Sequence, residues 1–110
     1  MRISNHLFIL VIMSLLFGGT ALAHRVNLFA YVEGGKIYTE SYFSDGTPVE
    51  GGKVLVYDNQ NKLLAEGVSD KKGLFDFSVP KVDDLIIVIE ATMGHKNNFK
   101  LKKAEVEAGK

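Results

Sequence analysis

Two histidines are the residues of this chain best suited to chemistry. The 110-residue sequence contains three histidines and no cysteine. His6 lies in a segment that we expect to be removed, which leaves His24 and His95. Histidine is the commonest metal ligand in proteins, and without thiolates a transition metal would have to be bound through nitrogen and oxygen. The sequence therefore predicts that His24 and His95 form a metal site.

The predicted removal concerns residues 1–23, which have the three-part pattern of a secretory signal peptide. Arg2 is the positive residue, residues 7–17 form an uncharged apolar run of eleven, and Ala21 and Ala23 are the small residues before a cleavage point. The alternative is a membrane anchor, but a spanning helix needs about 20 apolar residues. We expect cleavage after Ala23 and a periplasmic or otherwise secreted protein with no stable membrane span.

Cleavage after Ala23 would make His24 the first residue of the mature chain. Its α-amine, with a reference pKa of about 7.7 to 8.0, and its own Nδ1 could then chelate one metal ion, because a metal can displace the proton of such an amine. The imidazole of His95 would add a third nitrogen, in a set that suits Cu(II) or Ni(II) better than Mg²⁺ or Ca²⁺. The alternative is that His24 is an accident of the cleavage site and His95 a solvated loop residue.

Size and charge restrict the other possibilities. Lysine and arginine total 13 and so do aspartate and glutamate, so the chain lacks the broad basic surface that nucleic-acid binding needs. Removing residues 1–23 of the 110 leaves 87, enough for one small domain. Because that domain has no disulfide, its stability must come from a packed core or from a ligand that binds the folded form.

Turn residues divide the mature chain at the spacing of an antiparallel β-sandwich. In the first segment the small and aliphatic residues Val26, Leu28, Ala30 and Val32 recur with period 2 up to Gly34-Gly35, and no helical periodicity is visible. We expect residues 85–91 to form a central strand covered on both faces, residues 93–98 a polar loop, and residues 102–110 a charged, partly disordered tail. The six or seven predicted strands cover residues 26–33, 36–43, 53–58, 63–67, 74–79, 85–91 and 99–101.

The remaining polar and aromatic residues have structural explanations. The aspartates of the predicted turns are expected to accept hydrogen bonds from turn backbones, and Tyr38 and Tyr42 fit ordinary strand packing. No serine–histidine–aspartate arrangement is identifiable, so we expect a protein that is not an enzyme. The turn aspartates are Asp45, Asp58, Asp70, Asp83 and Asp84.

Two segments resemble the carboxypeptidase regulatory-like, transthyretin-like β-sandwich superfamily. They are residues 46–58 (GTPVEGGKVLVYD) and residues 67–77 (GVSDKKGLFDF), which match a strand-entry pattern and a hairpin pattern of that superfamily. The resemblance covers about a third of the mature chain and implies a small Ig-like or transthyretin-like sandwich over residues 24–101. It says little about function, because such sandwiches are scaffolds.

A second resemblance is to the exported accessory proteins of nickel and cobalt energy-coupling-factor transporters. It depends on residues 24–34 (HRVNLFAYVEG), 42–46 (YFSDG) and 93–96 (MGHK), and with the fold pattern it extends over most of residues 24–101. It implies that the N-terminal histidine and the Gly-His loop, here His24 and His95, contact a nickel or cobalt ion that membrane-embedded transporter subunits receive. Many members have a transmembrane helix after the position of Leu101, whereas this sequence continues with charged residues.

Three hypotheses follow. The first is an extracytoplasmic metal-binding protein that serves nickel or cobalt uptake. The second is a sandwich module that binds a partner protein through the basic residues of segment 96–103. The third starts from the likeness of an N-terminal histidine plus a second histidine to the copper brace of polysaccharide-cleaving oxidases and of small periplasmic copper carriers. Eighty-seven residues leave little substrate surface for an oxidase, but the affinity order of nitrogen sites favours Cu(II) over Ni(II), so a copper carrier stays open.

Overall fold

The structure, a computed structural model, describes residues 25–110. The signal peptide predicted at residues 1–23, which we expect to be helical, and His24 lie outside the described residues. The predicted all-β sandwich is confirmed, with seven strands in two sheets. The strands are β1 (Val26–Glu33), β2 (Lys36–Phe43), β3 (Lys53–Tyr57), β4 (Leu63–Val68), β5 (Leu74–Ser78), β6 (Leu85–Glu90) and β7 (Lys96–Leu101).

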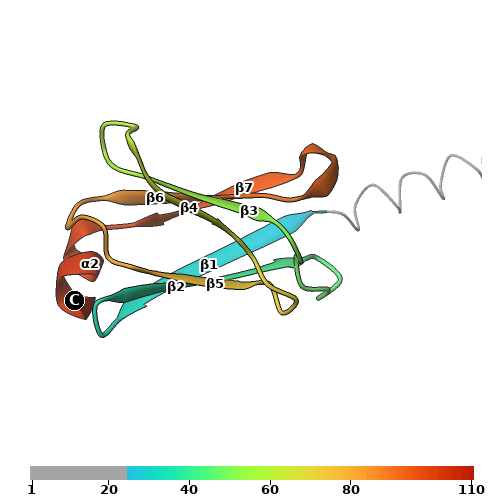
Figure 1. Cartoon of the computed structure of the whole chain (residues 1–110), viewed down its shortest axis with the longest axis horizontal. Helices are drawn as coiled ribbons and strands as arrows, with labels where there is room; N and C mark the ends of the chain where they lie inside the picture. Colours follow the sequence, from blue (N-terminus) through green and yellow to red (C-terminus); the bar gives the residue numbers. More distant parts are fainter. Residues whose placement is uncertain (1–24) are drawn as a thin grey trace, which may run out of the picture.

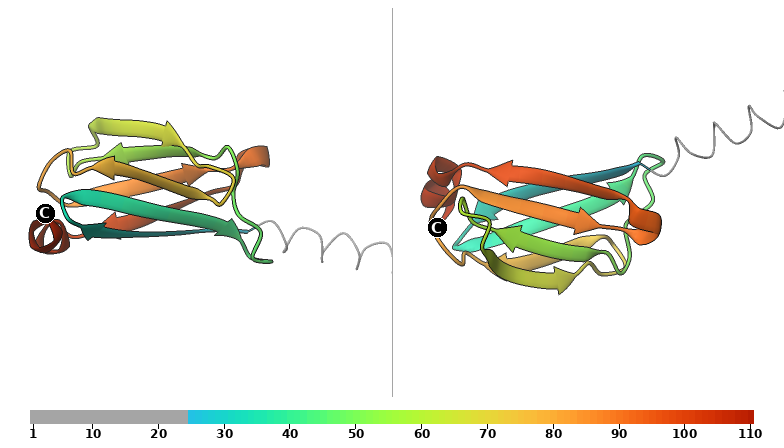
Figure 2. Two further views of the ribbon diagram at one scale, coloured as in Figure 1. Left: turned by 60° about the horizontal axis from the view of Figure 1, so that its bottom comes forward. Right: turned by 90° about the horizontal axis from the view of Figure 1, so that it is seen from above.

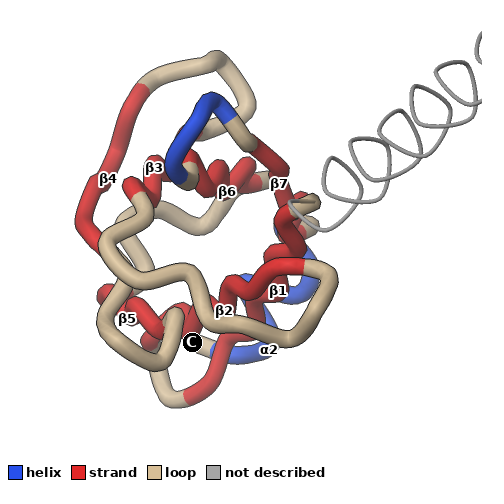
Figure 3. The backbone as a smooth tube through the Cα atoms, turned by 90° about the vertical axis from the view of Figure 1, so that its right-hand side faces the viewer, coloured by secondary structure: helices blue, strands red, loops and turns tan. Residues whose placement is uncertain are grey.

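The two sheets face each other as the layers of a sandwich (Figure 1). One has the strand order β1-β2-β5 and the other the order β4-β3-β6-β7, and every pair within them is antiparallel. The views in Figure 2 show the strands running along the long axis of the sandwich. Seen along the strands, β7 lies beside β1, so these two edge strands close one side of the sandwich (Figure 3).

The core follows from the alternation of apolar residues that the sequence shows. In β1, Val26, Leu28 and Ala30 are buried while the residues between them are half-buried or exposed. The first hairpin turns at Gly34-Gly35, where both residues have positive φ, as a two-residue hairpin turn that matches strand twist requires. Burial of these alternate rows between the sheets is the main source of stability in a domain without disulfides.

Strand β6 is central in its sheet, as predicted, but it is not covered on both faces. It lies between β3 and β7. Its residues Leu85, Ile87 and Ile89 are fully buried, whereas the alternate residues are only half-buried. The prediction of two covered faces was wrong because no layer of residues 25–110 packs on the outside of this sheet.

Several strand ends differ by one residue from the sequence-based prediction, and two larger differences lie near the C-terminus. Strand β7 begins at Lys96 rather than Phe99, because the polar residues before Phe99 still pair with β6 through their backbones. Residues 102–110, expected as a partly disordered tail, contain the helix α2 (Lys103–Gly109). The side chain of Val106 in this helix is fully buried in the core cluster, and the N–H of Gly35 donates to the carbonyl of Gly109 over 3.0 Å.

Candidate functional site: the rim at the start of β1 and β7

The predicted ligand His95 lies where β6 turns back into β7. A single short turn, η1 (Thr92–Gly94), joins the two strands. The N–H of Ala91 donates to the carbonyl of His95 over 2.8 Å, which closes the hairpin and places His95 directly at the start of β7. The side chain of His95 is half-buried, so the hairpin holds this imidazole at the end of the sandwich.

The start of β1 lies at the same end. Here the Asn97 side chain donates a hydrogen bond through Nδ2 to the carbonyl oxygen of Val26 over 2.9 Å. This bond joins residues 71 apart in the sequence and connects the two sheets. Figures 1 and 3 show β1 and β7 starting at this end of the sandwich, which we call the rim.

Alternation along the two strands relates the rim to the predicted ligands. Successive side chains of a strand point to opposite faces, so His95 belongs to the same row as Asn97. By the same rule a continued first strand would put His24 in the row of the buried Val26. Each histidine stands two positions before a partner of the Asn97–Val26 hydrogen bond. The two histidines could converge only if β1 begins at the end of the sandwich where β6 ends, and the structure has this arrangement (Figure 1). His24 itself lies outside the described residues.

The described residues do not supply a complete metal site. Within residues 25–110 there is no group of three or more histidine, cysteine, aspartate or glutamate side chains that could hold a metal ion. Near the rim, Glu90 lies 3.6 Å from the ammonium group of Lys96 across the hairpin. His95 is the one histidine that residues 25–110 can contribute at this rim, and the second predicted ligand, His24, lies outside the described residues.

The turn aspartates act as backbone acceptors, as predicted. Asp45 Oδ1 accepts from the N–H of Thr47, and Asp70 Oδ1 accepts from the N–H groups of Lys72 and Leu74. The bond from Leu74, followed by that from Lys72, lowers the pKa of Asp70. These carboxylates stabilise turns, and a carboxylate occupied in this way is a poor candidate for a catalytic base.

Asp58 is the most constrained of these carboxylates. Its side chain is 1% exposed, and its oxygens accept hydrogen bonds from the N–H groups of Lys62 and Gln60 and from the ammonium of Lys81. These bonds, chiefly the one from Lys62 and then the one from Lys81, lower the pKa of Asp58 to about 2. Two N–H groups of the β3–β4 turn and the Lys81 ammonium of the β5–β6 connection occupy the oxygens of Asp58, so the cluster is structural.

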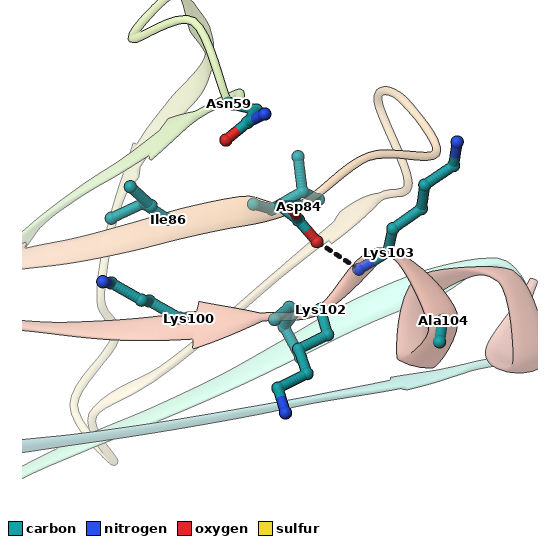
Figure 4. A pocket seen from close by; sticks show the side chains of 9 residues that line it. Asn59, Asp84, Ile86, Lys100, Lys102, Lys103 and Ala104 are labelled. Atoms are coloured by element: carbon teal, nitrogen blue, oxygen red, sulfur yellow. Dashed lines mark hydrogen bonds between the residues drawn. The ribbon is translucent and has the colours of Figure 1, made fainter.

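A hollow of about 540 Å³ lies at the end opposite the rim, between the start of β6 and α2. Lys100, Lys102 and Lys103 line it, and the N–H of Lys103 donates to Asp84 Oδ1 over 2.8 Å. The three lysine side chains point in different directions (Figure 4). Because their ammonium groups do not converge, the hollow lacks the arrangement that would bind one anion.

Aromatic rings cover the outer face of β1 and β2. Tyr38 stacks on Tyr31 with ring centroids 5.2 Å apart, and Tyr42 stacks on Phe29 at 5.8 Å. Phe29 and Tyr31 remain 48% and 49% exposed. The packing predicted for the two tyrosines is thus present across the strand pair, and each stacked pair adds about 0.5 to 1.5 kcal/mol beyond area burial.

Sequence reasoning missed two residues at the rim. Asn97 and Met93 both fell in the segment predicted as a polar loop. The contact of Asn97 with Val26 had no signal in the sequence, because it depends on how the two sheets meet. Met93 had a signal, an isolated apolar residue among polar ones next to a glycine and a histidine.

The fold and the rim define a class, a small all-β sandwich with a histidine at one end of its layers. No family model matches the chain. A protein of Haemophilus influenzae (strain ATCC 51907 / DSM 11121 / KW20 / Rd), described as an uncharacterized protein, is 30% identical over 79 residues. These residues are 69% of this chain and 49% of that protein, so the chain spans about half the length of this relative. No helix within residues 25–110 is long and apolar enough to cross a membrane.

Proposed function

We propose that the mature protein is an extracytoplasmic metal-binding protein that serves nickel or cobalt uptake, capturing the ion and presenting it to membrane-embedded transporter subunits. Periplasmic or secreted after cleavage behind Ala23, it binds the ion as cargo and is not an enzyme. The observation that supports the proposal best is the Asn97–Val26 hydrogen bond. It holds the start of β1 against the start of β7, two positions from each predicted ligand.

The chemistry follows from the donors that this rim can offer. The α-amine and Nδ1 of an N-terminal His24 would form a chelate, and the imidazole of His95 would supply a third nitrogen. Water or a carboxylate would complete the coordination. Such a nitrogen-rich set favours Ni(II) and Cu(II) over Mg²⁺ or Ca²⁺, so Cu(II) is the competing cargo.

The first test is metal binding by two forms of the protein that differ at one end. One begins at His24 and the other has a single glycine before it, and both are titrated with Ni(II), Co(II) and Cu(II) by calorimetry. We expect one equivalent to bind to the first form, and the extension to weaken binding at least about tenfold, because losses of about 10- to 100-fold follow even the removal of groups that only support a ligand. Equal affinity of the two forms would rule out the N-terminal chelate.

Matched variants test the second ligand. His95→Ala should weaken binding on the same scale, whereas Lys96→Ala, an adjacent exposed change, should not. Intact mass spectrometry of the exported protein, with and without added metal, would establish the first residue and the stoichiometry together. A mature chain that begins elsewhere than His24 would contradict the proposal.

A second candidate function is a non-metal interaction module. The exposed aromatic pairs on β1 and β2 favour it, since exposed aromatic residues are common at protein interfaces. If replacing both histidines leaves the binding of purified transporter subunits unchanged, and the parent protein binds no metal, this candidate replaces the first.

A further inference from the structure

Met93 stands at a backbone position that does not suit its residue type. Its φ is 62°, in the left-handed region that residues other than glycine, asparagine and aspartate seldom adopt. The other non-glycine residue with positive φ in residues 25–110 is Asn61, which belongs to a type that tolerates it. Glycine or asparagine would close the β6–β7 turn with less strain, so the turn does not explain a methionine here.

Burial does not explain Met93 either. A large apolar side chain stabilises a protein by leaving water, yet Met93 is 88% exposed, the highest value among the exposed large apolar residues of the described chain. Residues held in sparsely populated backbone conformations cluster at functional sites. What distinguishes methionine from the residues that would fit better is its thioether, so the chemistry of the sulfur is the remaining explanation.

The position of Met93 connects this sulfur to the predicted metal site. Met93 lies in the turn that leads into β7, two positions before His95. The Asn97–Val26 hydrogen bond brings the start of β1 to the same rim. Residues 25–110 contain one sulfur atom and one histidine, and both belong to this short hairpin segment.

We propose that the thioether of Met93 is an additional ligand at the rim, and that the site therefore accepts Cu(I) as well as the divalent ions. The proposal rests on the proposed function, namely that this rim binds a metal. Thioether sulfur is a soft ligand that selects Cu(I), whereas Ni(II) is served by the nitrogen donors. The three rotatable bonds of the methionine side chain allow it to follow an ion bound by His95, two positions away in the sequence.

The test compares two metals in two variants of the form that begins at His24. Cu(I) affinity is measured under anaerobic conditions by competition with a chromogenic Cu(I) chelator, and Ni(II) affinity by calorimetry. Met93→Leu keeps the size and apolar character of the side chain but removes the sulfur. Thr92→Ala, an exposed change in the same turn, is the matched control. We expect Met93→Leu to weaken Cu(I) binding at least about tenfold with Ni(II) binding unchanged, and Thr92→Ala to change neither.

A second measurement needs no variant. X-ray absorption of the Cu(I)-loaded parent should show a copper–sulfur scattering shell. A spectrum with nitrogen and oxygen alone, or an unchanged Cu(I) affinity in Met93→Leu, would overturn the role of Met93 while leaving the proposed function intact. A parent protein that binds Ni(II) but not Cu(I) would likewise overturn the role of Met93 and leave the proposed function intact. Failure of the parent to bind any of these ions would instead refute the proposed function.

Discussion

At the scale of single residues, the carboxylates of the turns have a common role. A carboxylate that accepts hydrogen bonds from two or more backbone N–H groups satisfies donors that would otherwise bond to water. Asp58 does this from a buried position and also binds Lys81. Its ionised form is therefore favoured by the fold, and the stability of the protein depends on it being charged.

The pH dependence of stability tests this role of Asp58. The folded-state pKa of about 2 lies below the ordinary value of 3.8. The contribution of Asp58 is thus present above the unfolded pKa and is lost as the pH falls through the interval down to about 2. In urea unfolding, Asp58→Asn should be less stable than the parent at pH 7, and the difference should shrink as the pH falls through that interval.

The control for Asp58 is Asp76→Asn. This change removes an ion pair with Lys36 whose side chains are both about half exposed, so it should alter stability little. A stability difference between Asp58→Asn and the parent that stays constant from pH 7 to the acid end would contradict the role given to the Asp58 charge.

At the scale of the elements, α2 shows how a short segment gains structure from its surroundings. A seven-residue helix is not stable alone in water. In this chain Val106 buries its side chain in the core cluster, and Gly109 accepts a hydrogen bond from the hairpin turn at Gly35. Helix α2 therefore closes the end of the sandwich opposite the rim, and it should contribute to the stability of the whole domain.

Truncation of Val106 tests this contribution. Val106→Ala should lower the free energy of unfolding by roughly 2 kcal/mol, the sum of lost transfer energy and the cavity left behind. Glu107→Ala changes an exposed residue of the same helix whose ion pair with Lys110 is more than half exposed, and it should have little effect. Equal stability of the parent and Val106→Ala in denaturant unfolding would show that the helix is not anchored through Val106.

At the scale of the whole molecule, the rim exists because the two sheets meet along β1 and β7. The Asn97–Val26 hydrogen bond joins a side chain of one sheet to the backbone of the other. Since β1 and β7 start at the same end (Figure 1), this contact holds the start of β1 beside the hairpin that contains His95. Asn97 is thus a positioning residue for the proposed site.

Replacing Asn97 tests this positioning role. Asn97→Ala should weaken Ni(II) binding about 10- to 100-fold, the usual effect of losing a group that orients metal ligands, and should alter the visible absorption spectrum of the bound ion. Asn98→Ala is the matched control, because the adjacent side chain belongs to the opposite row of β7. Unchanged affinity and spectrum in Asn97→Ala, with normal thermal unfolding, would contradict the role.

Much of this protein follows from local sequence pattern. The alternation in 26–33, the glycine pair at the first turn and the turn aspartates are short-range signals, and each predicted an element or contact that the structure contains. Such signals work because side chains alternate along a strand and because glycine and aspartate fit turns for reasons within a few residues.

Other features depended on contacts between distant segments. Local pattern did not predict three features: the helix at 103–109, the start of β7 at Lys96 and the half-exposed outer face of β6. These features depend on burial against distant strands and on backbone pairing between strands. The sequence determines that two histidines, His24 and His95, would remain after the predicted cleavage. Only the meeting of β1 and β7, through a hydrogen bond between residues 71 apart, brings the start of the first strand to the turn that contains His95.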